Sequence, residues 1–283
     1  MQDRIVLYLQ LMRVDKPIGF YLLMWPVLWA FLVSTNGSPS VFYMLIFGIG
    51  IIATRSAGCI INDYFDQDLD SKVERTKDRV LASKKVSNNE ALIIFFLLVL
   101  VCLILLVMLN LDILVLALLS MFLLIVYPLM KRYIKVPQLV LGLAFGSSIP
   151  MVFIVEIGEV NFNCFLLYLT TVIWAVVYDT YYAMADKRDD KKIGIQSSAI
   201  FFGKNDIKYS LYLHFVVLSL FFILGLINKF ELIFFIALFL SSITVIYQNL
   251  LARKRIPYQC ISAFENNNIF GLIVTFGLIF NYL

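Results

Sequence analysis

Nine runs of uncharged, mostly apolar residues limit the folds that this sequence can adopt. They cover residues 18–34, 41–54, 91–109, 113–130, 136–155, 162–177, 211–227, 232–250 and 269–283. Such runs suit the hydrocarbon core of a bilayer, which a helix crosses in about 20 residues. We therefore predict an all-α membrane protein with about nine transmembrane helices.

Composition excludes the main alternatives to a membrane protein. The chain is 61% apolar and only 15% charged, whereas a soluble domain is about 45–50% apolar and about 25% charged. These values exclude a soluble enzyme, a disordered chain and a secreted disulfide scaffold. Residues 1–16 lack the apolar core of a signal peptide, so no cleavage is expected there. The nine spans leave no room for a soluble domain, so residues 1–283 are expected to form one integral-membrane domain.

Positive charge gathers in alternate connections between the runs. If the nine helices alternate in direction, 21 of the 23 Lys and Arg residues fall on one side, and the exceptions are Arg55 and Lys229. Because basic loops stay in the cytoplasm, the N-terminus is predicted to be cytoplasmic. We expect a multi-pass protein of the bacterial inner membrane, or of the mitochondrial inner membrane in a eukaryote. No nucleic acid and no obligate protein partner are expected.

Two connections on the basic side, 63–90 and 183–208, are longer than the others and rich in Asp, Lys and Arg. The second apolar run leads into the first of them through Asn62, Asp66 and Asp70, which recur every four residues. On a helix this spacing forms one stripe. Clustered carboxylates are unfavourable at a helix C-terminus, so a cation is expected among them. The alternative is a solvated helix end with scattered acids.

The sixth run ends in a similar way. Asp179, Asp186 and Asp190 follow it at spacings of seven and four and fall near one helix face. Asp179 comes directly after apolar residues, where a carboxylate is costly unless it has a function. Oxygen ligands from a few carboxylates suit Mg²⁺, which usually also binds substrate phosphates. The two stripes therefore predict a magnesium site on the cytoplasmic side.

Basic side chains are interleaved with these acids. They are Lys72, Arg75, Lys77 and Arg79 after the first stripe, Lys191 and Lys192 after the second, and Lys131 and Arg132 after the fourth run. Acids that hold Mg²⁺, with Lys and Arg around them, are typical of a diphosphate site. The alternative for many of these residues is simple positive-inside signalling.

Arg55 is anomalous because it lies inside the second run. It precedes Asn62 by seven residues, which puts it on nearly the same helix face and about two turns deeper. A lipid-facing arginine there would be costly, so it should point into the bundle. It either pairs with an acid or receives a carboxylate on a second substrate, which Arg binds in bidentate fashion. His214, the one histidine, is interpreted as structural.

Several segments together resemble the UbiA superfamily of intramembrane prenyltransferases, and within it the 4-hydroxybenzoate polyprenyltransferase branch of ubiquinone synthesis. They are Arg13-Val-Asp-Lys-Pro-Ile-Gly19, Trp25-Pro26 with Trp29, Ala57-Gly-Cys-Ile-Ile-Asn-Asp63, Asn62-x3-Asp66-x3-Asp70, Arg75-Thr76, Tyr127-Pro-Leu-Met-Lys-Arg132, Gly142-x3-Gly146-x3-Pro150-Met151, Tyr178-Asp-Thr-x-Tyr182-Ala183, Asp186-x3-Asp190 and Ile193-Gly194-Ile-Gln-Ser-Ser198. This ordered set is specific. One departure is Arg79-Val80-Leu81, where the family often has Arg-Pro-Leu, which puts the rigidity of that loop in question.

The resemblance implies nine helices around a central cavity, with the loops 63–90 and 183–208 as a cytoplasmic cap. It also implies Mg²⁺-dependent transfer of a polyprenyl group from polyprenyl diphosphate to the ring carbon ortho to the hydroxyl of 4-hydroxybenzoate. Two Mg²⁺ ions would be held by Asn62, Asp66, Asp70, Asp186 and Asp190. Asp66, Asp70, Asp186 and Asp190 are the expected catalytic residues, with Asp179 orienting the phenol or accepting the ring proton.

Substrate binding is expected from a second set of residues, with Arg55 on the benzoate carboxylate. The set is Arg55, Asn62, Asp63, Lys72, Arg75, Tyr127, Lys131, Arg132, Tyr182 and Lys192. A cation-coupled transporter is the main alternative, but it would place its acids near the bilayer midplane. An intramembrane CDP-alcohol phosphotransferase would need a different Asp motif. Within the superfamily, haem, naphthoate or tocopherol-type acceptors remain open.

Overall fold

The computed structural model describes residues 4–109 and 111–283, so residues 1–3 of the predicted cytoplasmic segment lie outside it. The described residues form helices and turns and contain no strand. The helices are α1 (Arg4–Leu11), α2 (Ile18–Ser34), α3 (Val41–Asp70), α4 (Asn88–Met108), α5 (Leu114–Met130), α6 (Gln138–Gly146), α7 (Ser148–Ile157), α8 (Phe162–Ile193), α9 (Ser198–Phe202), α10 (Asp206–Ile227), α11 (Leu232–Ala252) and α12 (Pro257–Asn281), with 3-10 turns at Leu111–Ile113 and Gly203–Asn205. The predicted all-α fold is confirmed.

The predicted spans fall largely within apolar helices of the structure. Within residues 4–109 and 111–283, seven helical stretches are long and apolar enough to cross a bilayer. The helices α2 and α5 are also apolar but shorter, at 17 residues each. The fifth run is one such stretch, divided between α6 and α7 at Ser147. The chain is thus a multi-pass membrane protein, while nine crossings and a cytoplasmic N-terminus stay predictions.

Three helices extend further than the apolar runs suggested. Helix α3 continues to Asp70 and α8 continues to Ile193, so both acidic stripes lie on helices rather than in the long connections. Helix α12 begins at Pro257, well before the apolar run at 269. Polar residues extend a helix at its wet end until a breaker is reached. For α8 that breaker is Gly194, whose φ of 78° provides a left-handed C-cap.

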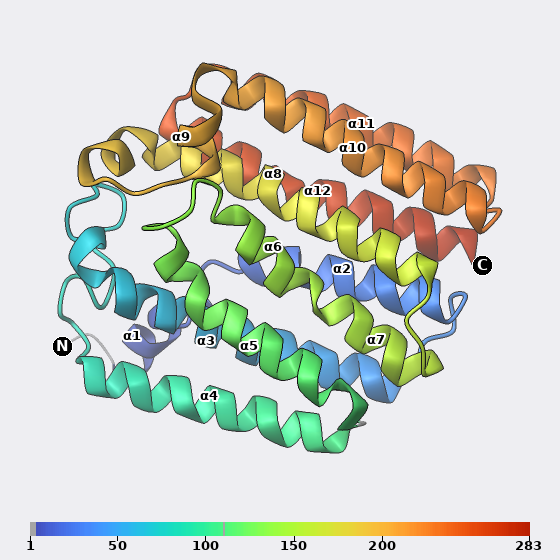
Figure 1. Cartoon of the computed structure of the whole chain (residues 1–283), viewed down its shortest axis with the longest axis horizontal. Helices are drawn as coiled ribbons and strands as arrows, with labels where there is room; N and C mark the ends of the chain where they lie inside the picture. Colours follow the sequence, from blue (N-terminus) through green and yellow to red (C-terminus); the bar gives the residue numbers. More distant parts are fainter. Residues whose placement is uncertain (1–3, 110) are drawn as a thin grey trace.

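The helices lie side by side, and their connections gather at two ends (Figure 1). The end on the left of the view carries α1, α9 and the segment between α3 and α4. The turns from α5 to α6 and from α11 to α12 lie at this end too. These are the connections that hold most of the basic residues. The chain ends at the opposite side, as expected for an odd number of crossings.

Aromatic side chains pack together in the interior of the bundle. Trp29 and Trp174 pack with ring centroids 5.1 Å apart, and Phe221 lies edge-on to Trp29 at 5.0 Å. The indole of Trp29 donates to Thr275 at 2.8 Å, and that of Trp174 donates to Asn267 at 3.0 Å. Buried indole N–H groups need such partners because the bilayer offers none.

An ionic cluster fixes α8 at its polar end. The fully buried Asp206 at the start of α10 accepts from Lys187 of α8 at 2.5 Å and from Arg255, just before α12, at 2.6 Å. The exposed fractions of the Lys187 and Arg255 side chains are 13% and 41%. One carboxylate therefore ties α8 to the start of α10 and to the segment just before α12.

Replacing Asp206 by Ala should lower the free energy of unfolding by about 3–5 kcal/mol, because Lys187 would remain buried without its counter-charge. The measurement is the midpoint of thermal unfolding in detergent. As a control, Asp189→Ala removes the pair with Lys192, whose side chain is 74% exposed, and should cost less than about 1 kcal/mol. Equal midpoints for the two variants would contradict this role for Asp206.

Candidate active site

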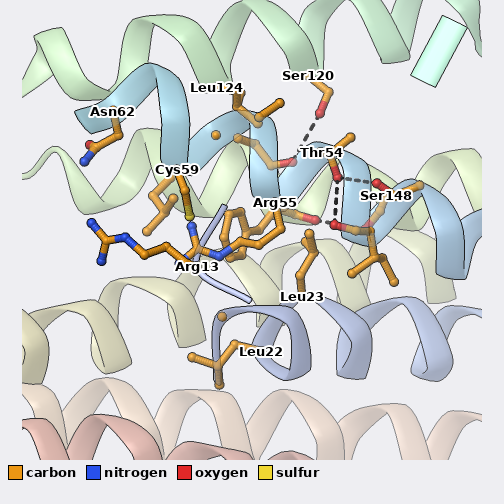
Figure 2. A pocket seen from close by; sticks show the side chains of 18 of the residues that line it. Arg13, Leu22, Leu23, Thr54, Arg55, Cys59, Asn62, Ser120, Leu124 and Ser148 are labelled. Atoms are coloured by element: carbon orange, nitrogen blue, oxygen red, sulfur yellow. Dashed lines mark hydrogen bonds between the residues drawn. The ribbon is translucent and has the colours of Figure 1, made fainter. Parts of the chain in front are cut away.

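A cavity of about 850 Å³ opens between α2, α3, α5 and α8 and extends deep into the bundle. Its inner walls are apolar, with side chains such as Phe47, Leu105 and Met121. Figure 2 shows Asn62 and Arg13 toward one end, Arg55 in the middle, and Thr54 and Ser148 toward the other end. The cavity thus joins a polar mouth to a dry apolar interior.

The α3 side of the mouth is held by arginines from outside that helix. Arg13 binds Asp63 through both carboxylate oxygens, at 2.8 and 2.9 Å. Arg79 donates to Asp63 at 3.1 Å and to Asp70 at 2.7 Å. Asp63 and Asp70 are 2% and 8% exposed. Since buried carboxylates are costly without counter-charges, these arginines allow α3 to place both acids in the interior.

Lys131, at the end of α5, contacts the predicted acidic stripe. Its Nζ donates to Asp66 at 2.9 Å and to Asn62 at 3.1 Å. Burial opposes the charge of Lys131, but the Asp66 carboxylate outweighs this effect and raises the pKa of Lys131 above its ordinary value. Lys131 is therefore a cation at neutral pH. The second oxygen of Asp66, Oδ1, is buried and has no hydrogen-bond partner among residues 4–109 and 111–283.

The α8 side of the mouth repeats this arrangement. Arg75 binds Asp186 through Nε and Nη2, with 2.8 Å from Nε to Oδ1. Its guanidinium also lies over the Tyr182 ring, 4.4 Å from the centroid, in a cation–π contact. Asp190 lies one turn further along α8.

A second cavity of about 90 Å³ is lined by both predicted acidic stripes, through Asp66 and Asp70 of α3 and Asp186 and Asp190 of α8. Six of its lining residues also line the larger cavity, namely Arg75, Arg79, Tyr127, Lys131, Asp179 and Tyr182. The two cavities therefore adjoin. The stripes, more than a hundred residues apart in sequence, face one another across this space.

Asp179 lies about two turns before Asp186 on α8, and Arg55 lies about two turns before Asn62 on α3, so both are deeper than the other acids of the site. The Tyr127 hydroxyl donates to Asp179 at 3.5 Å, and Arg55 lines the same cavity as both groups. Among the residues that the structure describes, no carboxylate pairs with Arg55 and no hydrogen bond reaches its side chain. The interpretation of Arg55 as the partner of an acid is thus not supported.

Three predicted substrate-binding residues, Lys72, Arg132 and Lys192, line neither cavity. Arg132 donates to the backbone oxygen of Phe65 at 2.9 Å. Lys72 and Lys192 are exposed. Lys192 instead pairs with Asp189 at 3.0 Å.

Arg13 and Gln138 were not predicted as site residues from the sequence, and Arg79 was named only among the basic residues interleaved with the acids. Arg13 and Arg79 hold the acids of α3, and the buried Gln138 lines the smaller cavity and accepts from the backbone N–H of Ser198 at 2.9 Å. Arg13 and Arg79 lie in segments that resemble the family. In the sequence alone they cannot be told apart from the basic residues that serve only as positive-inside signals. Nothing local in the sequence distinguishes Gln138.

The donor set fits Mg²⁺. Carboxylate oxygens from two helices line one small cavity, and Asp66 Oδ1 is a buried oxygen to which no described residue donates a hydrogen bond. In the described part of the chain, no three acidic, His or Cys side chains are grouped closely enough to hold a metal ion by themselves. Mg²⁺ usually takes only one or two carboxylates and completes its shell with water and substrate phosphates.

An apolar cavity in a helical membrane bundle, with facing carboxylates and cations at its mouth, defines an intramembrane enzyme of phosphorylated lipids. The model of the UbiA prenyltransferase family matches residues 23–273, and the chain belongs to this family. The predicted family resemblance is thereby confirmed.

Curated relatives share over two fifths of their residues with this chain. A Haemophilus ducreyi protein named 4-hydroxybenzoate octaprenyltransferase is 43% identical over 263 residues, covering 93% of this chain and 95% of the relative. A Coxiella burnetii protein of the same name is 42% identical over 282 residues, covering 100% and 98%.

Solved structures confirm the fold. The apo structure of a UbiA homologue from Aeropyrum pernix has a TM-score of 0.81 at 21% identity, covering 94% of this chain and 99% of that one. A UbiA homologue from Archaeoglobus fulgidus, bound to GPP and Mg²⁺, has a TM-score of 0.70 at 18% identity, covering 96% and 99%.

Replacing Arg79 by Ala should lower the free energy of unfolding by about 3 kcal/mol, because Asp70 would lose its counter-charge in the interior. Thermal unfolding in detergent measures the effect. Adding Asp70→Asn should restore part of the loss, since an amide needs no counter-charge. Lys77→Ala is the control in the same segment, because its pair with Glu74 is exposed. No recovery in the double variant would contradict the assigned pairing.

Proposed function

We propose that this protein transfers a polyprenyl group from a polyprenyl diphosphate to the ring carbon ortho to the hydroxyl of 4-hydroxybenzoate, with release of diphosphate, as a step of ubiquinone synthesis. The observation that carries the proposal is the pair of acidic stripes that line one small cavity beside a deep apolar cavity. The names of the relatives support the acceptor. The bacterial relatives also favour a bacterial inner membrane.

The proposed diphosphate site lies at the polar mouth. Asn62, Asp66, Asp70, Asp186 and Asp190 would hold Mg²⁺ there, which supplies positive charge to stabilise the leaving diphosphate. Lys131 and Arg75, which pair with Asp66 and Asp186, would donate to phosphate oxygens. The segments 63–90 and 183–208 would cap this mouth.

The apolar interior suits the isoprenoid chain. When the allylic C–O bond breaks, its electron pair leaves with the diphosphate and an allylic cation remains. Water would quench this cation, and the walls around Phe47, Leu105 and Met121 exclude it. The ring carbon ortho to the phenol hydroxyl then forms the new C–C bond and loses its proton.

The acceptor is proposed to lie between Arg55 and Asp179. Arg55 carries a positive charge in the cavity wall, and a planar carboxylate is the partner that its guanidinium binds best. Asp179, next to Tyr127, would orient the phenol hydroxyl or accept the ring proton. Tyr182 and Asn62 complete the polar wall around the reacting carbons.

Asp66→Ala and Asp190→Ala should each lower prenyl transfer by about 10³-fold, equivalent to about 4 kcal/mol of transition-state stabilisation. The assay follows labelled 4-hydroxybenzoate into a lipid-soluble product at saturating Mg²⁺. Asp68→Ala is the matched control, because Asp68 is exposed on the same helix and lines neither cavity. Turnover retained in folded Asp66→Ala and Asp190→Ala would refute the diphosphate site.

Arg55→Ala should raise the KM for 4-hydroxybenzoate by about 10–100-fold, since a charge-assisted hydrogen bond contributes about 1.5–3 kcal/mol. The KM for the prenyl diphosphate should change by less than about twofold. Arg55→Lys keeps the charge but loses the planar fork, so its KM should be intermediate. Equal effects on both substrates would remove the proposed role of Arg55.

A further inference from the structure

The side chain of Arg55 lies against a glycine in the first turn of α2. A Cβ on Gly19 would lie 2.2 Å from Nε, 2.4 Å from Nη2 and 2.7 Å from Cζ of Arg55. Because Cζ is the farthest of these three atoms, the guanidinium presents its Nε–Nη2 edge to Gly19. Both residues line the large cavity. No residue other than glycine leaves room for Arg55 in this position.

The same segment of chain is anchored to α3 a second time. Arg13, six residues before Gly19, binds Asp63, which is eight residues after Arg55 on α3. The turn between them is closed by a bond from the backbone N–H of Lys16 to the oxygen of Arg13, at 3.1 Å. The ion pair therefore fixes the position of the start of α2 along the axis of α3, and in this position Gly19 lies beside Arg55.

Packing must set the position of Arg55, because polar contacts do not. Arg13, Arg75, Arg79 and Lys131 are each held by a carboxylate in the same region. Over residues 4–109 and 111–283, neither a hydrogen bond nor an ion pair fixes Arg55. At Gly19 the absence of a side chain leaves the space that the guanidinium occupies, because a Cβ there would overlap it.

We propose that Gly19 is a positioning residue that holds the Arg55 guanidinium at the place where the acceptor carboxylate binds. It thereby favours acceptors that carry a carboxylate over phenols that do not. This inference rests on the proposed function, in which Arg55 binds the carboxylate of 4-hydroxybenzoate. It adds a residue that acts through Arg55.

The test is Gly19→Ala, assayed with 4-hydroxybenzoate, with a phenol that lacks the carboxylate, and with the prenyl diphosphate. The new methyl group meets the far end of a flexible side chain, so Arg55 moves while the fold is kept. Alanine also favours a helix over glycine, and the midpoint of thermal unfolding should not fall. We expect the KM for 4-hydroxybenzoate to rise about tenfold, with kcat, turnover of the phenol and the KM for the prenyl diphosphate within about twofold.

A double-mutant cycle separates positioning from a structural effect. In the Arg55→Ala background there is no guanidinium to displace, so Gly19→Ala should then have no further effect on the KM for 4-hydroxybenzoate. Gly48→Ala is the control, because a Cβ on Gly48 of α3 meets nothing within 4 Å. Its kinetic constants should match those of the parent protein.

Two results overturn the inference and can be told apart. In the first, Arg55→Ala selectively raises the KM for 4-hydroxybenzoate, but Gly19→Ala either changes nothing or has the same effect in both backgrounds. Gly19 then does not position Arg55, and the proposed function stands. If Arg55→Ala has no selective effect on this KM, the acceptor role of Arg55 fails, and the role of Gly19 fails with it.

Discussion

The pairing of interior carboxylates with Lys and Arg is the interaction on which the active site depends. A carboxylate without a counter-charge is costly in a low-dielectric interior, and α3 alone buries Asp63, Asp66 and Asp70. Cations come from the segment before α2, from the connection after α3 and from the end of α5. The charges of one helix therefore fix the positions of three other segments around the cavity.

This pairing also connects the fold to the chemistry. The cations that neutralise the acids of the chain have the charge that a diphosphate requires, and they stand beside the acids that suit Mg²⁺. Directly below them the cavity becomes apolar. A leaving group that needs charge and a carbocation that must be kept from water can thus be accommodated within one continuous space.

Periodicity in the sequence predicted much of this arrangement. The uncharged runs gave the helices, and the four-residue spacing of Asn62, Asp66 and Asp70 placed them on one face of α3. Helix ends were less predictable from the apolar runs. Helix α8, for example, continues through polar residues to Ile193 and ends at the Gly194 cap. The apolar runs stop earlier, so they gave no sign of this extension.

Contacts between distant residues were the least predictable part. Arg79 and Lys72 are both basic residues in the polar segment after α3. Of these two, Arg79 pairs with the acids of α3, whereas Lys72 is exposed. The contact of Gly19 with Arg55 joins two helices and depends on how α2 is anchored through Arg13. Such differences follow from packing between helices, which residue spacing does not encode.

The most direct test of the facing acidic stripes is a structure with Mn²⁺ in place of Mg²⁺ and an unreactive prenyl thiolodiphosphate. We predict Mn²⁺ bound to at least one carboxylate of α3 and one of α8, with the diphosphate between them beside Lys131 and Arg75. The isoprenoid chain should lie in the apolar cavity. A diphosphate bound elsewhere, or Mn²⁺ without contact to Asp66, Asp70, Asp186 or Asp190, would contradict the account.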